Sequence, residues 1–424
     1  MAKLHKALLA LTLLCGGCQL LELDRQVQQA HRELVLVAGQ LEASNPSTAL
    51  VALLDGQGKA VAYRIVAPGN AFYFTVAAGT YQLLAFADDN GNFRLDPDEA
   101  RHWLAQARSV ALRLQPDDAT RAALQRSNRL QLGATAQAED TPDVDLSLDK
   151  LYANQPRLRS NYLQQVGLDD PRFDPQRVSQ GAWEPLSYIR EVGYGLYLLE
   201  PWDDDKEPVF LVHGINDSPR TWQALLDGLD RQRFQAVLFH YPGSLPLNNS
   251  AYLLSEAIQN VQLRQGVERF HIVAHSMGGL VARRAVQLLE SNAGSQNLCL
   301  LLTLATPWDG HPAAATGLKQ APVIVPTWRD LAPGSAYLQA LFAKPLPAHV
   351  RQWLLVSYSG NSRLLTQPND GVVPLASQLR GAAQDEAEHL YLLEEDHTSI
   401  LHSKRSKALL ARALDSLPAS GCAP

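Results

Sequence analysis

The sequence lacks any concentration of charge. Its 424 residues include 37 Lys and Arg and 43 Asp and Glu, which gives a formal net charge of −6, and these residues are spread along the chain. Proteins that bind nucleic acid through a basic surface carry clustered Lys and Arg. The absence of such a cluster argues against a nucleic-acid partner.

Long hydrophobic runs and cysteines are also scarce. The apolar run near the N-terminus, residues 7–14, is shorter than the roughly 20 residues of a transmembrane helix. Of the four cysteines, only Cys299 and Cys422 lie beyond residue 18, and two cysteines do not make a disulfide framework. Cys299 lies in the apolar run "NLCLLLTLATP", which favours a small buried hydrophobic side chain. The sequence leaves the pairing of the two cysteines open.

The N-terminal residues have the features of a secretory signal. Lys3 and Lys6 form a short basic region, the apolar run follows, and small residues come before a cysteine in "LLCGGC". The sequence therefore predicts export from the cytoplasm.

The end of this signal resembles the lipobox of bacterial lipoproteins, in which the cysteine after two small residues becomes the lipidated N-terminus. The resemblance implies a signal peptide over residues 1–17, lipidation of Cys18 and a lipidated tether over residues 18–32. Cys15 stands where an aliphatic residue is usual, so an ordinary cleaved signal is the alternative. Gln19, in place of Asp after the lipidated cysteine, implies a lipid-anchored location at the outer membrane of a Gram-negative cell envelope.

Residues 33–133 contain short apolar or alternating runs such as "LVLVAGQL", "ALVALLDG" and "VAYRIVA", separated by Gly, Asn and Pro. This spacing predicts a small antiparallel β-sandwich. The stretch "FYFTVAAGTYQLLAFADDNGN" resembles the prealbumin-like and carboxypeptidase-regulatory-like β-sandwich modules, which implies an accessory domain.

A loop over residues 88–99, "DDNGNFRLDPDE", carries oxygen-bearing side chains at the spacing of an EF-hand calcium loop. Phe93 occupies the sixth position, where a glycine is usual, and no helical pair clearly flanks the loop. The loop therefore has two interpretations, a structural calcium site or a solvated turn rich in Asp and Asn. The candidate calcium ligands are Asp88, Asn90, Asn92, Asp96 and Glu99.

The composition and the hydrophobic pattern of the sequence change after residue 133. Residues 134–189 are rich in Asp, Pro and Gln and predict a linker with an irregular lead-in. Over residues 190–418, apolar strands such as "PVFLVHG" alternate with helix-length segments. This alternation predicts a doubly wound, mostly parallel sheet of the α/β class, covered by helices on both faces and preceded by the β-sandwich. The helix-length segments are residues 218–230, 250–265, 277–290 and 401–415.

Ser276 lies between a strand and a helix in "FHIVAHSMGGLVARR". Small residues at 274, 278 and 279 allow the strand and the helix to approach closely, and a strained turn between them holds the serine hydroxyl out at the edge of the sheet. The pattern is a nucleophile elbow, G-x-S-x-G, with Ala274 in the first position. The alternative is a serine that only caps a helix.

A nucleophilic serine needs a base, and the base needs an acid to orient it. Asp370 follows the strand "QWLLVSYSG", and His397 follows the strand "HLYLLEED". The order Ser276, Asp370, His397 is the order found in α/β-hydrolase folds. Asp309 in "ATPWDGH" is the main rival for the acid. Weaker rivals are Asp385, Glu395 and Asp396, and structural roles are expected for His213, His240, His271 and His275.

The combined pattern HG-x-N-D…AHSMGG…TP-x-x-G…DG-x-VP…H resembles the lipase and esterase branch of the α/β-hydrolase superfamily. The resemblance implies that the backbone N–H groups of Ile215 and Met277 form an oxyanion hole. It also implies that no metal or organic cofactor is required. An apolar excursion over about residues 308–350 lies where such enzymes insert a cap, and its side chains suit either a mobile cap or packing on the core.

Together these features predict a membrane-anchored serine carboxylester hydrolase: a lipase, an esterase or a phospholipase that acts on lipophilic esters through an acyl-enzyme. Two alternatives stay open. One is an acyltransferase that uses the same three residues, and the other is a non-catalytic binding or scaffold lipoprotein of the cell envelope. The expected partners are the ester substrate and the membrane, and the sequence indicates no protein partner.

Overall fold

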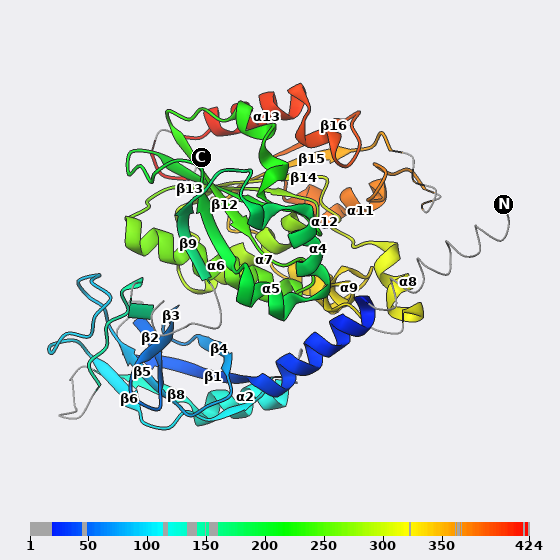
Figure 1. The fold of residues 1–424 in the computed structure, drawn as a ribbon. Coiled ribbons are helices and arrows are strands. Elements are labelled where there is room, and N and C mark those ends of the chain that lie inside the picture. Colours follow the sequence, from blue (N-terminus) through cyan, green and yellow to red (C-terminus); the bar gives the residue numbers. More distant parts are fainter. Residues whose placement is uncertain are drawn as a thin grey trace.

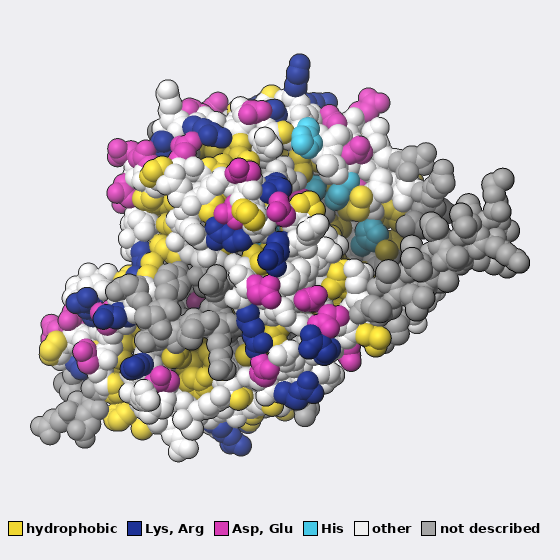
Figure 2. Space-filling view, viewed as in Figure 1, with side chains coloured by type: hydrophobic (Ala, Val, Ile, Leu, Met, Phe, Trp, Pro, Cys, Tyr) yellow, Lys and Arg dark blue, Asp and Glu magenta, His cyan; other side chains and the backbone are white. Residues whose placement is uncertain are grey.

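The computed structural model describes residues 19–44, 49–112, 118–133, 142–148, 150–151, 160–321, 324–360, 362, 365, 367–418 and 420–422. A smaller N-terminal part of strands lies beside a larger α/β part (Figure 1). Acidic and basic side chains are interspersed over the face shown in Figure 2. Within the described residues, no helix has the length and apolarity needed to cross a membrane.

Cys18 and the predicted signal peptide lie outside the described residues, so the lipid anchor stays a prediction.

Two sheets that pack face to face make up the N-terminal part. Their shared core contains Val37 and Phe74 from one sheet and Val51 and Leu83 from the other. The first sheet consists of β4 (Ala71–Ala77), β1 (Leu34–Ala43), β7 (Ser109–Ala111) and β8 (Arg129–Leu132). The second consists of β3 (Ala60–Val66), β2 (Ala49–Asp55), β5 (Tyr81–Phe86) and β6 (Arg101–Leu104).

The predicted antiparallel pairing holds for most of these strands, but β8 runs parallel to β1. A helix that was not predicted, α2 (Asp118–Ser127), precedes β8 and places it there. The period-two pattern of the sequence is clearest in β4, where Phe72, Phe74 and Val76 are buried between more exposed residues.

The side chains of the loop predicted as a calcium site form hydrogen bonds within the loop. Asp96 accepts hydrogen bonds from the side-chain amides of Asn90 and Asn92, and Glu99 accepts from two backbone N–H groups. Phe93 adopts a left-handed conformation, with φ of 60°, at the position where EF-hand loops have glycine. In the part of the chain that the structure describes, no group of three or more His, Cys, Asp or Glu is arranged to hold a metal ion. The calcium interpretation stays a prediction.

A single eight-stranded sheet runs through the described α/β part, with the order β16-β15-β14-β13-β11-β12-β10-β9. Neighbouring strands are parallel except β10 and β12, so the structure confirms the predicted fold class. The strands are β9 (Ser160–Gln165), β10 (Tyr194–Leu198), β11 (Glu207–Val212), β12 (Phe234–His240), β13 (Phe270–His275), β14 (Leu298–Leu304), β15 (Arg351–Ser357) and β16 (His389–Leu393).

Helices cover both faces of this sheet (Figure 1). One apolar cluster joins the sheet to α6 (Leu247–Gln265) and α7 (Met277–Ser291), and a second joins the other face to α13 (Lys404–Asp415). The helix predicted over residues 218–230 is absent. Two short 3₁₀ helices, η2 (Pro219–Trp222) and η3 (Leu225–Gly228), take its place, because this stretch contains proline, glycine and Asp, which are weak helix formers.

The segment predicted as linker and lead-in carries regular structure that was not predicted. It supplies β9 at the edge of the sheet, the 3₁₀ helix η1 (Pro171–Phe173), α4 (Pro175–Trp183) and α5 (Pro185–Glu191). The sequence of β9, "SNYLQQ", is polar because an edge strand need not be buried on both faces, so it has no continuous apolar run.

The predicted tether begins with a helix over the described residues 19–33 that packs on α5. Leu23 and Gln26 are buried, and the Gln26 side chain exchanges hydrogen bonds with the hydroxyl and backbone N–H of Ser187. Glu33 also pairs with Arg190. The end of the chain nearest Cys18 is thus fixed to the α/β part.

The predicted cap region folds into three short helices, α8 (Pro312–Gln320), α9 (Pro326–Leu331) and α10 (Ala336–Leu341). Trp308, Leu331 and Leu338 are buried in the main core, and Trp328, Tyr337 and Phe342 pack against it. Of the two interpretations of this excursion, the structure shows the one in which its apolar residues pack on the core.

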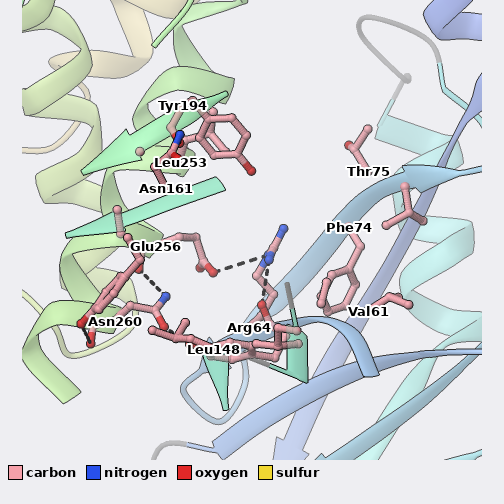
Figure 3. Close-up of a pocket in the computed structure, with 17 residues that line it drawn as sticks. Val61, Arg64, Phe74, Thr75, Leu148, Asn161, Tyr194, Leu253, Glu256 and Asn260 are labelled. Atoms are coloured by element: carbon pink, nitrogen blue, oxygen red, sulfur yellow. Dashed lines mark hydrogen bonds and ion pairs between the residues drawn. The ribbon is translucent and has the colours of Figure 1, made fainter. Parts of the chain in front are cut away.

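Polar and aromatic contacts join the two parts of the molecule. The Tyr73 and Tyr252 rings stack with centroids 4.0 Å apart, and the Arg64 guanidinium lies 3.5 Å from Glu256 on α6. Figure 3 shows this ion pair beside a cavity of about 180 Å³ between the two parts. Burial raises the pKa of Glu256 from 4.5 to about 7, although the positive charge of Arg64 opposes the shift.

Glu256 should make the protein less stable as the pH rises. Its carboxyl binds a proton more tightly in the folded protein than in the unfolded chain. Its contribution to the free energy of unfolding is therefore fully present below pH 4.5 and is lost as the pH rises through 7. From about pH 4 to about pH 8, the free energy of unfolding should fall by about 3 kcal/mol in wild type relative to Glu256→Gln. Urea denaturation at several pH values measures this difference, and parallel curves for the two proteins would contradict it.

A disulfide joins Cys299 on β14 to Cys422 near the C-terminus, across 123 residues of sequence. Cys299 is completely buried, as its apolar surroundings predicted, but as half of a disulfide. This bond fastens the end of the chain to the central strands of the sheet.

Cys422→Ser should lower the free energy of unfolding by about 4 to 5 kcal/mol, because the unfolded chain gains the entropy of a long open loop. Denaturation in the absence of reductant measures this loss. With reductant present, the wild type should fall to the stability of the variant. A wild type whose stability is insensitive to reductant would show that the bond is absent.

Candidate active site

Ser276 occupies a sharp turn between β13 and α7. Its backbone has φ of 54° and ψ of −131°, a conformation that non-glycine residues rarely adopt. Hydrogen bonds hold it there: its N–H donates to the carbonyl of Leu304, and its own carbonyl accepts from Gly279. The strained turn projects the Ser276 side chain from the end of the strand, as the elbow pattern predicts.

The glycines after Ser276 allow this turn because α7 meets the sheet almost without clearance. A Cβ atom on Gly278 would lie 2.3 Å from the carbonyl oxygen of Val212, and one on Gly279 would lie 2.1 Å from Oγ1 of Thr306. A larger residue at position 278 would have to move the backbone, and one at position 279 would have to displace Thr306. The close approach predicted from the small residues is therefore confirmed.

His397 lies on the loop after β16 and faces the serine. Its Nε2 is 2.9 Å from Oγ of Ser276, and its backbone N–H donates to the carbonyl of Asp370, with N and O 2.8 Å apart. The structure thus brings together two residues that are 121 positions apart in the sequence.

Asp370 is fully buried and lies on the other side of the His397 ring, with Oδ2 2.8 Å from Nδ1. Oδ2 also accepts from the Ser357 hydroxyl at 2.7 Å and the Gln378 amide at 3.0 Å. Oδ1 accepts from two backbone N–H groups, those of residues 372 and 373. Burial acts to raise the pKa of Asp370, but His397 and these hydrogen bonds outweigh it and lower the pKa. Asp370 is thus held as a carboxylate.

Ser357 and Gln378 are functional contacts that sequence reasoning missed. Ser357 is the last residue of β15 and Gln378 is the last residue of the short helix α11 (Leu375–Gln378), and neither belongs to a recognisable motif. Only the folded arrangement reveals them.

Three of the four rival acids have other partners. The Asp309 side chain is 57% exposed and lies 3.4 Å from the Arg380 guanidinium. Asp396 accepts from the backbone N–H groups of the turn that follows it, and Glu395 accepts from the Ser399 hydroxyl. Asp385 ends the short helix α12 (Gly381–Asp385).

His275, next to the serine in sequence, supports His397 from beneath. Its Nε2 donates to the carbonyl of His397 at 2.9 Å. Burial and the neighbouring His397 lower the pKa of His275 to about 3, so its ring is neutral. Of the other histidines expected to be structural, His271 is buried with Nε2 2.8 Å from Glu207.

The two predicted oxyanion donors border the serine. Met277 is the first residue of α7, where a backbone N–H has no acceptor within its helix. Ile215 follows Gly214, and a Cβ atom on Gly214 would lie 3.0 Å from the Cβ of Ser276. Among the residues that the structure describes, neither N–H has an acceptor. Both are therefore available to a negatively charged oxygen beside Ser276.

The sequence pattern of the alpha/beta hydrolase family matches residues 209–421, which is half of the chain. The chain belongs to the alpha/beta hydrolase family. Serine, histidine and aspartate in hydrogen-bonded order can transfer a proton from the hydroxyl to the imidazole while the serine attacks an electrophile.

Solved structures that are similar to this hydrolase cover about half of it. The mature lipase BlEst2 of Bacillus licheniformis is 17% identical, with a TM-score of 0.40, over 51% of this chain and 93% of its own. A Listeria innocua gene product is 14% identical, with a TM-score of 0.40, over 52% and 98%. Phospholipase PlaB of Legionella pneumophila is 19% identical, with a TM-score of 0.34, over 41% and 45%. A comparison with curated protein sequences finds no match.

Asp370→Asn should slow the reaction of Ser276 with a fluorophosphonate probe by roughly 10³- to 10⁴-fold, because the amide no longer stabilises the charged imidazole. The rate of probe attachment, followed by intact-protein mass spectrometry, measures the effect. Asp309→Asn is the matched control and should react at the wild-type rate. The opposite ranking of the two variants would make Asp309 the acid.

Proposed function

We propose that this alpha/beta hydrolase is a serine carboxylester hydrolase that acts on lipophilic esters. The observation that carries the proposal is the continuous line of hydrogen bonds from Oγ of Ser276 through the His397 ring to the buried carboxylate of Asp370. A serine that only caps a helix would not need this partner.

In the proposed reaction, Oγ of Ser276 attacks the ester carbonyl carbon while Nε2 of His397 takes the hydroxyl proton. Asp370 keeps the ring oriented and stabilises its positive charge. The oxygen of the tetrahedral intermediate receives hydrogen bonds from the N–H groups of Ile215 and Met277. The ester bond then breaks, and His397 returns the proton to the leaving alcohol.

The second half of the proposed reaction releases the acid. A water molecule gives a proton to Nε2 of His397 and attacks the acyl carbon, and the bond to Oγ of Ser276 breaks as the proton returns to that oxygen. His275 holds the backbone carbonyl of His397 and stays neutral itself, so the ring is fixed without a competing positive charge beneath it.

The preference for lipophilic esters is proposed on two supports outside the catalytic residues. The sequence resembles the lipase and esterase branch, and its N-terminus resembles a lipoprotein signal. The helix over residues 19–33 is bound to α5 through Gln26 and Ser187, so a lipid on Cys18 would keep the hydrolase close to the outer membrane. The packed excursion over residues 308–350 adds no support of its own.

Ser276→Ala should reduce the hydrolysis of p-nitrophenyl esters by on the order of 10⁶-fold, that is, to background. The test uses esters with acyl chains from acetyl to palmitoyl, and longer chains should be cleaved with the higher kcat/KM. Ser127→Ala, at an exposed position on α2, is the control and should retain wild-type activity.

Three results would change the proposal. Wild-type activity in Ser276→Ala would remove the assignment of the nucleophile. Transfer of the acyl group to an added alcohol or lysolipid, in place of its release as free acid, would make the protein an acyltransferase. A wild type that neither cleaves any ester nor reacts with a fluorophosphonate would favour a non-catalytic lipoprotein.

A further inference from the structure

Three polar side chains lie buried behind the loop that carries Ile215. His213 follows β11, His240 ends β12, and Tyr188 lies on α5, ahead of the region that matches the family. His213 and Tyr188 are completely buried, and His240 is 1% exposed. Buried polar groups are costly unless they are hydrogen-bonded, so the arrangement of these three calls for an explanation.

The three side chains form one chain of hydrogen bonds that ends on the oxyanion loop. Tyr188 Oη contacts Nε2 of His240. Nδ1 of His240 lies 3.0 Å from Nε2 of His213, and Nδ1 of His213 lies 2.8 Å from the carbonyl oxygen of Gly214. Each ring nitrogen in the chain therefore has one partner.

The direction of the chain follows from the carbonyl at its end. A carbonyl can only accept, so Nδ1 of His213 carries the proton. Burial lowers the pKa of both histidines, which are therefore neutral and have one proton each. Nε2 of His213 must then accept from Nδ1 of His240, and Nε2 of His240 must accept from the Tyr188 hydroxyl. Burial raises the pKa of Tyr188, which keeps this hydroxyl protonated.

The acceptor of this chain shares a peptide bond with a proposed oxyanion donor. The carbonyl of Gly214 and the N–H of Ile215 belong to one planar group and point in opposite directions. If the carbonyl is held toward His213, the N–H must point to the other side of the loop, and Gly214 packs directly against Ser276. Tyr241 braces the same histidine, because its ring stacks on His213 at 4.6 Å and its hydroxyl donates to the His213 carbonyl.

We infer that Tyr188 and His240 are positioning residues for the oxyanion hole, and that they act through His213 to fix the peptide that carries the N–H of Ile215. The inference rests on the proposed function, because it assigns a role within the same site. It makes α5, which the family pattern does not include, a part of the machinery that stabilises the transition state.

Tyr188→Phe removes the first donor of the chain and leaves Nε2 of His240 without a partner. The hydroxyl then no longer fixes the orientation of the His240 ring, which weakens the donation from His240 to His213. We expect kcat for ester hydrolysis to fall about 10- to 100-fold, as is typical for residues that orient a catalytic group, with KM unchanged. The affinity for a phenylboronic acid, whose adduct with Ser276 places an oxygen in the oxyanion hole, should fall by a similar factor.

The matched control is Tyr197→Phe, in the same aromatic cluster. The Tyr197 hydroxyl accepts from the side chain of Asn161, and its ring centroid lies 6.5 Å from that of His240. This variant should keep the wild-type kcat and boronic acid affinity. Equal losses in both variants would indicate general damage to packing and overturn the inference, and so would wild-type kcat and boronic acid affinity in Tyr188→Phe.

A second measurement needs no variant. Nitrogen-15 NMR of wild-type protein labelled at histidine should show His213 and His240 neutral and protonated at Nδ1 at pH values above the ordinary histidine pKa of 6.5, because burial lowers the pKa of both. A proton on Nε2 of either residue would overturn the inference. Failure of the proposed function would appear differently, as a wild type with no esterase activity and no labelling of Ser276, whatever the state of these two rings.

Discussion

The close approach of α7 to β11 and β14 is the constraint on which the site depends. At Gly278 the first turn of the helix lies against the backbone of Val212 on β11. At Gly279 it lies against the side chain of Thr306, which follows β14. Only then can Ser276 turn the chain so sharply that its hydroxyl faces His397. The strain of that turn is stabilised by the many contacts of the buried strand and helix on either side.

The other parts of the site converge on this point from loops at the same edge of the sheet. Carboxyl ends of parallel strands meet there, which brings the loops after β11, β13, β15 and β16 together. Asp370 shows how firmly they are joined, because its carboxylate receives hydrogen bonds from its own turn, from the end of β15, from a helix and from His397. The loops are thus held by each other as well as by the sheet.

Prediction from the sequence was most accurate for features in which a residue type at that position has a single physical explanation. The apolar strands, the glycines after Ser276 and the chain order of Ser276, Asp370 and His397 each carry such a reason, and the structure has the strands, the close approach and the three side chains together. The sequence did not identify residues whose role depends on a partner far away in the chain. Gln378, Tyr188 and Gln26 are ordinary polar residues until the fold places them beside Asp370, His240 and Ser187.

The regular structure within residues 134–189, which were expected to be a linker with an irregular lead-in, was missed for a different reason. Their strand is polar and their helices are short, so neither periodicity nor apolar length identified them. For the excursion over residues 308–350, the sequence left two interpretations open. Its apolar residues are equally compatible with covering a substrate and with packing on the core, and composition alone does not distinguish the two.

The position of β9 has a consequence for how this molecule behaves among its own copies. β10 is apolar and buried, and without β9 its outer edge would offer unpaired backbone groups to any extended chain nearby. β9 satisfies that edge and replaces it with one whose last two side chains, Gln164 and Gln165, are exposed amides. The pairing of β9 with β10 also shifts register between Gly195 and Tyr197, and such an irregularity makes the outer strand a poorer template for another chain.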